Sequence, residues 1–122
     1  MGIAFESLKK IVDKINVSEK AKQVFVTDIG GKPIDWNMKF QFNLNNEEPF
    51  YLETKSRKAI LKQGTVATAD IIMFGDNNSI VKICNGKGDF THAISREEIV
   101  VEKGKMIEII RLTRAIAIVL KA

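Results

Sequence analysis

The sequence predicts a single α+β domain, and three patterns support that prediction. Residues 5–15 place apolar side chains at helical spacing, and residues 106–120 do so again at the end of the chain. Between them, residues 36–44 alternate apolar and polar side chains, as a strand with one buried face does. The predicted order is helix, hairpin-linked strands, short helices, strand and helix, which is typical of an α+β domain.

Length and charge limit the classes of function. The chain has 122 residues, so we expect one domain, residues 1–122, with a substantial core. Its net charge of +4 comes from scattered basic residues, which favours a solvated surface over a nucleic-acid partner. A weak attraction to anionic lipid surfaces stays open.

Cysteine usage and the distribution of apolar residues suggest a compartment. The single cysteine, Cys84, excludes an internal disulfide and agrees with a reducing environment. Residues 1–5 lack the long apolar region of a signal peptide, and no apolar segment reaches the ~20 residues that span a bilayer. We therefore expect a cytoplasmic protein.

The first part of the chain predicts a helix and a hairpin. Residues 5–15 form an amphipathic helix, and Ser18 can cap a short turn through Lys22. Residues 23–29 are rich in β-branched side chains and predict a strand. Gly30 and Gly31 then make a tight turn, and Pro33 is expected to keep the second strand from starting early.

The middle of the chain predicts further strands. Residues 36–44 form a strand whose buried face carries bulky side chains: Trp36, Met38, Phe40, Phe42 and Leu44. A turn at residues 45–49 leads to a third strand at residues 50–55. The pattern in residues 56–68 fits either a strand or a helical turn, and this alternative stays open.

Short elements follow before the last helix. Residues 69–74 predict an apolar strand, residues 75–79 a break that offers helix caps, and residues 80–85 a short helix. A second short helix is expected at residues 89–95 and a strand at residues 99–101. Residues 102–104 turn the chain into the final helix.

The final helix is the main indication of function. Residues 106–120 are apolar nearly all round in their second half, so the helix must be covered on more than one side. One face can pack on a sheet. The other needs a cavity, a bound apolar molecule, a partner chain or a membrane.

Residues that would support catalysis are few. His92 is the only histidine and has no nucleophile or second ligand at useful spacing, so a solvated or capping role is favoured. A zinc site would need more Cys and His ligands than the chain has. We therefore expect no enzyme activity, no metal and no cofactor. The aromatic strand 36–44 lacks basic residues on its aromatic face, which argues against nucleic acid.

The C-terminal half resembles the sterol carrier protein family of non-specific lipid-transfer proteins. The resemblance rests on the run 69–74, on Gly86, Asp89, Phe90 and Ala93, on the strand 99–101, on Gly104, and on the apolar final helix. It extends over residues 5–120 and is closest to the free-standing prokaryotic-type members. Lys103 looks like an extra residue before Gly104.

The resemblance implies a fold and a ligand. It implies a five-stranded, mostly antiparallel sheet with helices on one face, and a C-terminal helix that covers an apolar tunnel. The tunnel would hold a fatty acid, fatty acyl-CoA or sterol-like ligand. The residues that would line it are Phe40, Phe42, Ile72, Phe74, Ile80, Ile83, Phe90, Ile94, Val101, Met106, Ile109 and Ile110. Lys82, Lys87 or Lys105 would meet a charged headgroup.

Two alternatives stay open beside a lipid carrier. The apolar side chains could simply fill a core, and the final helix would then serve as a homodimer interface or a docking site for another protein. Alternatively, residues 115–120 could lie in a membrane surface. We expect a lipid ligand, with transient membrane contact and a homodimer as further predictions.

Overall fold

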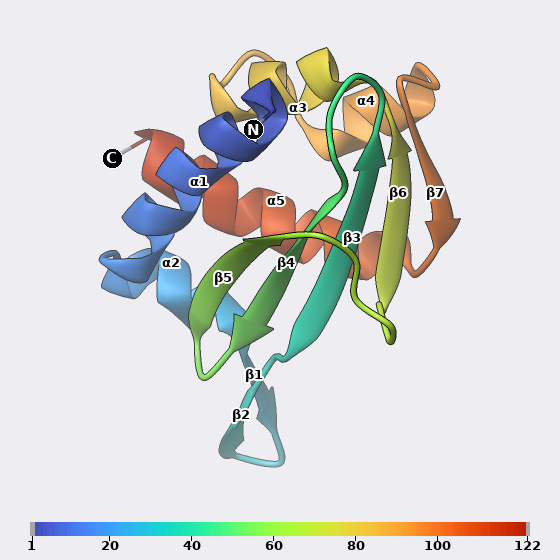
Figure 1. Ribbon diagram of the computed structural model, residues 1–122. Helices are drawn as coiled ribbons and strands as arrows, with labels where there is room; N and C mark the ends of the chain where they lie inside the picture. The colour runs from blue at the N-terminus through green and yellow to red at the C-terminus, as the bar shows by residue number, and fades with distance from the viewer. Residues whose placement is uncertain (1, 122) are drawn as a thin grey trace.

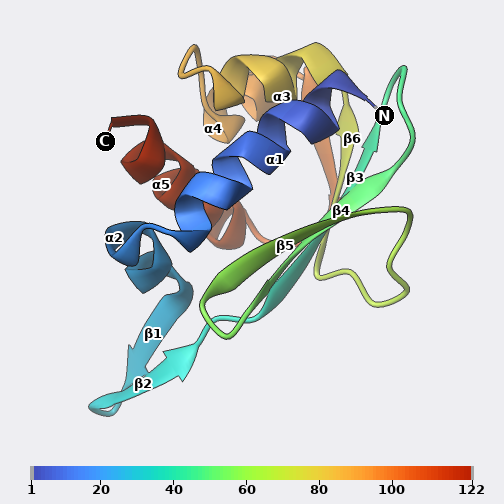
Figure 2. The ribbon, with the colours of Figure 1, turned by 60° about the vertical axis from the view of Figure 1, so that its left-hand side comes forward.

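The structure, a computed structural model, describes residues 2–121 as a five-stranded sheet with helices covering one of its faces (Figure 1 and Figure 2). Met1 and Ala122, which belong to the expected domain 1–122, lie outside the described residues. A small two-stranded hairpin projects from one end of the molecule. The predicted α+β class and the helices on one face of the sheet are confirmed.

The helices and strands alternate in groups along the chain. In chain order they are α1 (Ile3–Asn16), α2 (Glu19–Lys22), the 3₁₀ turn η1 (Gln23–Phe25), β1 (Val26–Ile29), β2 (Lys32–Asp35), β3 (Met38–Leu44), β4 (Phe50–Lys55), β5 (Lys58–Gln63), β6 (Ile71–Gly75), α3 (Asn77–Cys84), α4 (Phe90–Ser95), β7 (Ile99–Lys103) and α5 (Met106–Lys121).

The large sheet has the strand order β5-β4-β3-β6-β7. β3 and β6 run parallel, and the other neighbouring strands run antiparallel, so the sheet is mostly antiparallel as predicted. The segment whose structure the sequence left open contains β5, which pairs with β4 along its length. The turn between β4 and β5 places Ser56 and Arg57 at φ +53° and +66°, the left-handed values that a tight hairpin turn requires.

The hairpin of β1 and β2 differs from the sequence prediction in two ways. The strand expected over residues 23–29 begins only at Val26, because Gln23 to Phe25 form a 3₁₀ turn. The second strand begins at Lys32 and includes Pro33, which the sequence analysis expected to delay it. Pro33 is tolerated because the hairpin has no third strand, so its missing N–H can lie on an open edge.

The alternation in β3 sets which sheet face packs against the helices. Phe40 and Phe42 are fully buried on the helix side, and their neighbours across the sheet, Ile71 and Met73, are buried beside them. Trp36 is buried too, but it precedes β3, and its backbone N–H donates to the carbonyl of Phe25. The predicted apolar face is confirmed. Its first residue, Trp36, lies before β3 and links the end of the hairpin to η1.

A side-chain cap precedes each of the short helices α2, α3 and α4. Ser18 accepts a hydrogen bond from the backbone N–H of Ala21, Asp76 from that of Asn78, and Asp89 from that of His92. α3 therefore begins at Asn77, earlier than the expected Ile80. The first helix, α1, buries its apolar stripe against α3, α5 and β5.

The final helix is buried on one side along its whole length. Its buried residues are Ile109, Leu112, Ala115, Ile116 and Val119. Three apolar residues near its start, Met106, Ile107 and Ile110, are exposed. The sequence analysis expected the surplus apolar surface in the second half of this helix, and the structure corrects that expectation. Ala115, Ile116 and Val119 are buried there, and the uncovered apolar residues lie in the first turns.

Candidate functional site

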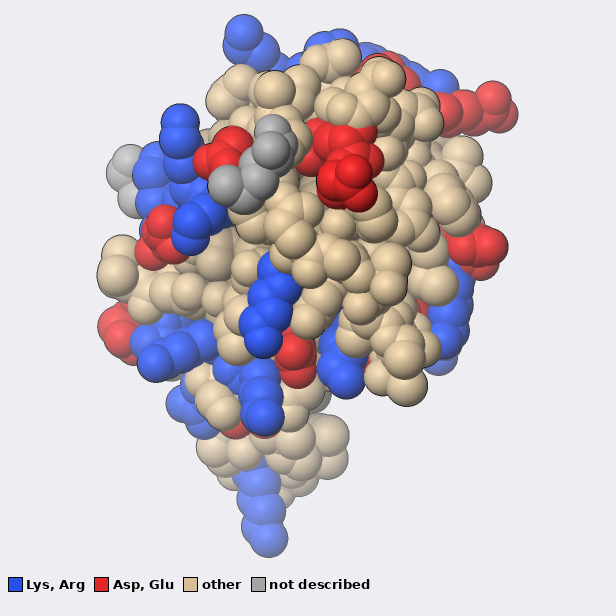
Figure 3. All heavy atoms as spheres, in the orientation of Figure 1, with Lys and Arg blue, Asp and Glu red and all other residues tan. Residues whose placement is uncertain are grey.

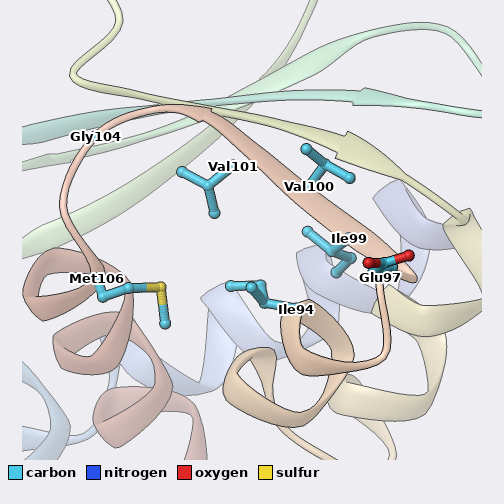
Figure 4. A pocket seen from close by; sticks show the side chains of 7 residues that line it. All are labelled: Ile94, Glu97, Ile99, Val100, Val101, Gly104 and Met106. Carbon is cyan, nitrogen blue, oxygen red and sulfur yellow. The ribbon is translucent and has the colours of Figure 1, made fainter.

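The most apolar hollow near the uncovered part of α5 lies where β7, α4 and the start of α5 meet. It is a groove of about 600 Å³, open to solvent and lined by Ile94, Glu97, Ile99, Val100, Val101, Gly104 and Met106. Figure 4 shows the side chains of Ile94, Val101 and Met106 pointing into the space between the strand and the two helices. These three residues come from three different elements, so the groove depends on how the elements are spaced.

Local backbone features set that spacing. Ile72 pairs with Lys103 and Met73 with Val101, so Glu102 is an extra residue that bulges out of β7. The sequence analysis gave Lys103 as the extra residue before Gly104, but Lys103 is paired in the sheet and the unpaired residue of the bulge is Glu102. Gly104, at φ +112°, then turns the chain into α5. A Cβ at this position would lie 2.7 Å from the Cγ1 atom of Ile71, so the close approach requires glycine.

Charged residues stand at the two ends of the groove. Glu97 lines it at the turn between α4 and β7. At the other end, Lys105 lines an adjoining hollow with Gly104 and Glu108. Lys103 is engaged elsewhere, because its Nζ atom donates to the carbonyl of Ala69 at 2.8 Å. Asp70 also lines that hollow, so the Lys105 end carries charges of both signs, whereas an anionic group would be repelled at the Glu97 end.

A second, smaller groove follows the other half of α5. Its volume is about 310 Å³, and it lies between α5 and the loop that joins α3 to α4. Its lining residues are Ile83, Gly86, Gly88, Asp89, Thr113, Ile116, Ala117, Leu120 and Lys121. Because Asp89 caps the start of α4 and Ile94 lies near its end, α4 separates the two grooves.

The structure divides the twelve predicted wall residues into four groups. Three line the larger groove: Ile94, Val101 and Met106. Ile110 is exposed on α5. Six are buried in the core, and one of them, Ile83, also borders the smaller groove: Phe40, Phe42, Ile80, Ile83, Phe90 and Ile109. The last two, Ile72 and Phe74, alternate along β6 with the buried Ile71 and Met73, so they lie on the sheet face away from the helices.

Ile72 and Phe74 therefore correct the sequence prediction. The apolar run in β6 does not reveal which residues face the helices, and the pairing with β3 decides it: Phe40 lies opposite Ile71, and Phe42 opposite Met73. Ile71 and Met73 take the positions that the sequence analysis gave to their neighbours.

The space between sheet and helices is filled with aromatic rings. Phe42 stacks on Phe50 with ring centroids 5.0 Å apart, and the ring centroid of Phe90 lies 6.4 Å from that of Phe42. Phe40, Phe42, Phe50 and Phe90 have no surface that a water molecule could reach. A side chain without such surface lines no space large enough for a lipid. The predicted tunnel is therefore not confirmed.

Several groove residues are not identified by the sequence analysis. Ile99 and Val100 belong to the strand that the sequence predicts, but a single short strand does not show which residues border a hollow. Glu97 takes a left-handed conformation with φ +62°, which no local motif indicates. Ile116 and Leu120 of the second groove belong to the segment that the sequence analysis considered for a membrane or protein contact, not for a groove.

The structure places the titratable residues that the sequence analysis considered. His92 is exposed, and its Nδ1 atom lies 3.3 Å from the capping carboxylate of Asp89. Burial raises the pKa of the Cys84 thiol to about 12. Among residues 2–121 there is no cluster of three or more His, Cys, Asp or Glu arranged to hold a metal. Within the same residues, every helix is too short or too polar to cross a bilayer.

Comparison with known proteins gives structural neighbours. No protein-family model matches the chain, and no curated protein does. The solved structure of palmitated SCP2L2 from Aedes aegypti superimposes with a TM-score of 0.65 at 17% identity, covering 95% of each chain. TT1886 from Thermus thermophilus, described as "possibly sterol carrier protein", superimposes with a TM-score of 0.67 at 15% identity, covering 95% of this chain and 82% of that one.

Two further structural neighbours share the fold at low sequence identity. The UbiJ-SCP2 ubiquinone synthesis protein gives a TM-score of 0.68 at 10% identity, covering 93% of this chain and 88% of that chain. The sec-alkylsulfatase Pisa1 from Pseudomonas sp. gives 0.55 at 13% identity, and this chain spans only 12% of its length. At these identities the comparisons show the fold alone, and this chain has the sterol carrier protein fold.

Proposed function

We propose that this chain binds the acyl chain of a lipid and carries it, without catalysing a reaction. The observation that supports the proposal is the apolar groove at the uncovered start of α5, where Ile94, Val101 and Met106 face one another. A structural neighbour with the same fold is described as palmitated, which agrees with a fatty-acid ligand. Fatty acids, fatty acyl-CoA and sterol-like molecules are the ligands we propose, and the cytoplasm is the proposed compartment.

Binding in this groove would be driven by the burial of methylene groups. Each buried methylene contributes about 0.8 kcal/mol before the costs of ordering are subtracted. This contribution has no direction, so the groove would accept chains of different shapes. Glu97 at one end would repel a carboxylate or phosphate, whereas Lys105 at the other end offers a positive charge beside the carboxylates of Asp70 and Glu108. We propose that the headgroup lies at the Lys105 end.

The deeper predicted wall residues would take part only in a lipid-bound state. Phe40, Phe42, Phe90 and Ile109 are in van der Waals contact with their neighbours in the closed form. An acyl chain longer than the groove would have to push α4 or α5 away from the sheet to reach these residues. The tunnel is thus a proposal for the loaded protein, with the open groove as its entrance.

The test is a titration of delipidated protein with a fluorescent fatty acid, followed by displacement with palmitate and with palmitoyl-CoA. Met106→Glu places a carboxylate in the groove and is expected to weaken binding at least tenfold, since each lost methylene contact and the added repulsion both act against the ligand. Ile60→Glu is the matched control, because Ile60 is similarly exposed but lies on β5, away from the groove.

Three outcomes distinguish the possibilities. Saturable binding near one ligand per chain, weakened by Met106→Glu and unchanged by Ile60→Glu, would support the carrier and its groove. Equal effects of the two variants would place the lipid elsewhere. Absence of binding in protein shown to be folded would reject the proposal.

A second candidate is an interaction module or homodimer with a filled core. The observation that favours it is the absence of reachable surface on the core aromatics, together with exposed Ile107 and Ile110 on α5. Sedimentation of lipid-free protein over a range of concentrations tests it. A dimer that dissociates in Ile110→Glu would favour this candidate, and a monomer at all concentrations would reject the homodimer.

A further inference from the structure

One face of the β1–β2 hairpin exposes two isoleucines to solvent. Opposite residues in an antiparallel pair share a face, and so do residues two apart in one strand. The register pairs Thr27 with Ile34 and Ile29 with Lys32. These four residues therefore form one face, which we call the hairpin face. Ile29 is 58% exposed and Ile34 is 46% exposed, although the hairpin is too small to have a core of its own.

Arg111 joins the hairpin face to the start of α5. Its Nη1 atom donates to the Oγ1 atom of Thr27 at 2.7 Å and to the carbonyl of Val24 at 3.4 Å. Its guanidinium carbon lies 5.2 Å from the ring centroid of Trp36. The residue one helical turn earlier on the same stripe of α5 is Ile107, which is 66% exposed. Three exposed isoleucines thus belong to one end of the molecule.

Charged residues lie on both faces of the hairpin and on the neighbouring stripe of α5. Lys32 is the charged residue of the hairpin face, because Asp28 and Asp35 belong to the opposite face. Asp35 is paired with Arg57, whose Nε atom lies 2.9 Å from it. The stripe that holds Ile107 and Arg111 continues to Arg114, which is exposed.

The β4–β5 turn, which Arg57 joins to Asp35 on the other face of the hairpin, adds more positive charge. Lys55 and Lys58 lie opposite each other where β4 turns into β5, and Arg57 stands between them in the sequence. Figure 3 shows Lys and Arg side chains gathered around the base of the hairpin and a basic side chain at its tip. Figure 1 shows that the β4–β5 turn lies beside the base of the hairpin. This end of the molecule therefore combines exposed apolar side chains with excess basic charge.

We infer that this end of the molecule is a docking surface for anionic phospholipid membranes. The isoleucines would enter the boundary between headgroups and acyl chains, while Lys32 and its basic neighbours would contact lipid phosphates. A nucleic acid would use the basic residues but gain nothing from three exposed isoleucines. The docking surface is separate from the groove of α4, β7 and α5, so the inference stands whether or not that groove holds lipid.

The experiment is flotation of the purified protein with phosphatidylcholine vesicles, with and without phosphatidylserine. Binding is expected only to the anionic vesicles and is expected to fall as salt is raised. Lys32→Glu should weaken binding about fivefold or more, since each basic residue near an anionic surface contributes roughly this factor and the change reverses the charge. Its control is Lys9→Glu, which makes the same charge change on the exposed side of α1.

A second pair of variants tests the apolar contribution. The double variant Ile29→Ser, Ile34→Ser should weaken vesicle binding at least tenfold without changing the charge. Its control is Phe74→Ser, because Phe74 is 40% exposed on the outer sheet face, far along the sheet from the hairpin. Lys32 is an exposed residue, so Lys32→Glu keeps the test valid even if the serine variant does not fold.

Each outcome decides the inference. Weakening by both hairpin variants and by neither control would support it. Equal effects of hairpin and control variants would overturn it, and so would binding to a DNA duplex with none to vesicles. The fluorescent fatty-acid titration, run on the same proteins, keeps the two proposals apart: vesicle binding without fatty-acid binding rejects the carrier alone, and the reverse rejects the docking surface alone.

Discussion

The carboxylate of Glu47 caps the start of helix α1 by accepting a hydrogen bond from the backbone N–H of Ala4 at 3.0 Å. Its second oxygen accepts from the N–H of Phe5 at 3.2 Å, and Asn77 donates to the first at 3.0 Å. The cap comes from the β3–β4 turn, far along the chain, because Gly2 at the N-cap position has no side chain to offer. A negative charge at this end also interacts favourably with the helix dipole.

Replacing Glu47 should therefore destabilise the fold. Glu47→Ala is expected to lower the free energy of unfolding by about 1–2 kcal/mol, because two helix N–H groups lose their acceptor and the dipole loses its counter-charge. Urea denaturation measures the change. Glu48→Ala is the control, since Glu48 is exposed in the same turn. Equal midpoints for the two variants would contradict the capping role.

The second prediction is that the two faces of the sheet differ in how much an aromatic side chain contributes to stability. Phe42→Ala removes a ring that stacks on Phe50 in the closed core and should cost about 3–5 kcal/mol of stability. Phe74→Ala removes the same ring from the outer face and should change stability by no more than about 0.5 kcal/mol. Thermal or urea unfolding distinguishes them. A large cost for Phe74→Ala would show that β6 turns its other face to the helices.

The pair Phe42 and Phe74 also shows what the sequence can predict. Phe42 is assigned to the buried face because strict alternation over a whole strand fixes which side chains share a face. Phe74 lies in a continuous apolar run, where no polar residue marks the wet side. Its position follows from parallel pairing with β3, which is a contact between distant segments.

The candidate site can be predicted only in part for the same reason. Ile94, Val101 and Met106 are apolar positions of three predicted elements, and the structure brings them to one groove. Whether the space behind them is open depends on how the rings of the core fill it. That volume is a property of the packed molecule, and no spacing in the sequence encodes it.

Gln41 makes a third prediction, about the long connection between β5 and β6. The sequence pattern places Gln41 on the wet face of its strand, yet the side chain is buried. Its Nε2 atom donates to the carbonyls of Phe50 and Gly64, and its Oε1 atom accepts from the N–H of Val66 at 2.9 Å. This side chain holds the crossover loop against the outer face of the sheet.

Gln41→Leu should release the loop. We expect a loss of about 1–3 kcal/mol in stability, because buried backbone groups lose their partners. Amide hydrogen exchange at Val66 should become faster, whereas exchange in the core strands should change only with global stability. Gln63→Leu is the matched control at an exposed position at the end of β5. Unchanged exchange at Val66 would contradict the anchoring role.

Cys84 makes a fourth prediction, about stability at high pH. Burial raises the pKa of its thiol from 9.0 to about 12. Between these values the unfolded chain loses the proton while the folded protein keeps it, so the free energy of unfolding falls as pH rises. The slope is about 1.4 kcal/mol per pH unit between about pH 9 and about pH 12. Below about pH 9 the thiol is protonated in both states, and this dependence vanishes.

The comparison of the native protein with Cys84→Ala isolates this effect, because lysines and the tyrosine titrate in both proteins. The difference between their free energies of unfolding should be constant below about pH 9 and shrink above it. A thiol reagent offers a second readout at about pH 8. Since the thiolate is the reactive species, Cys84 should react slowly in the folded protein and rapidly in urea. Rapid reaction in the folded protein would mean that α3 opens readily, and that the burial which raises this pKa is not maintained in solution.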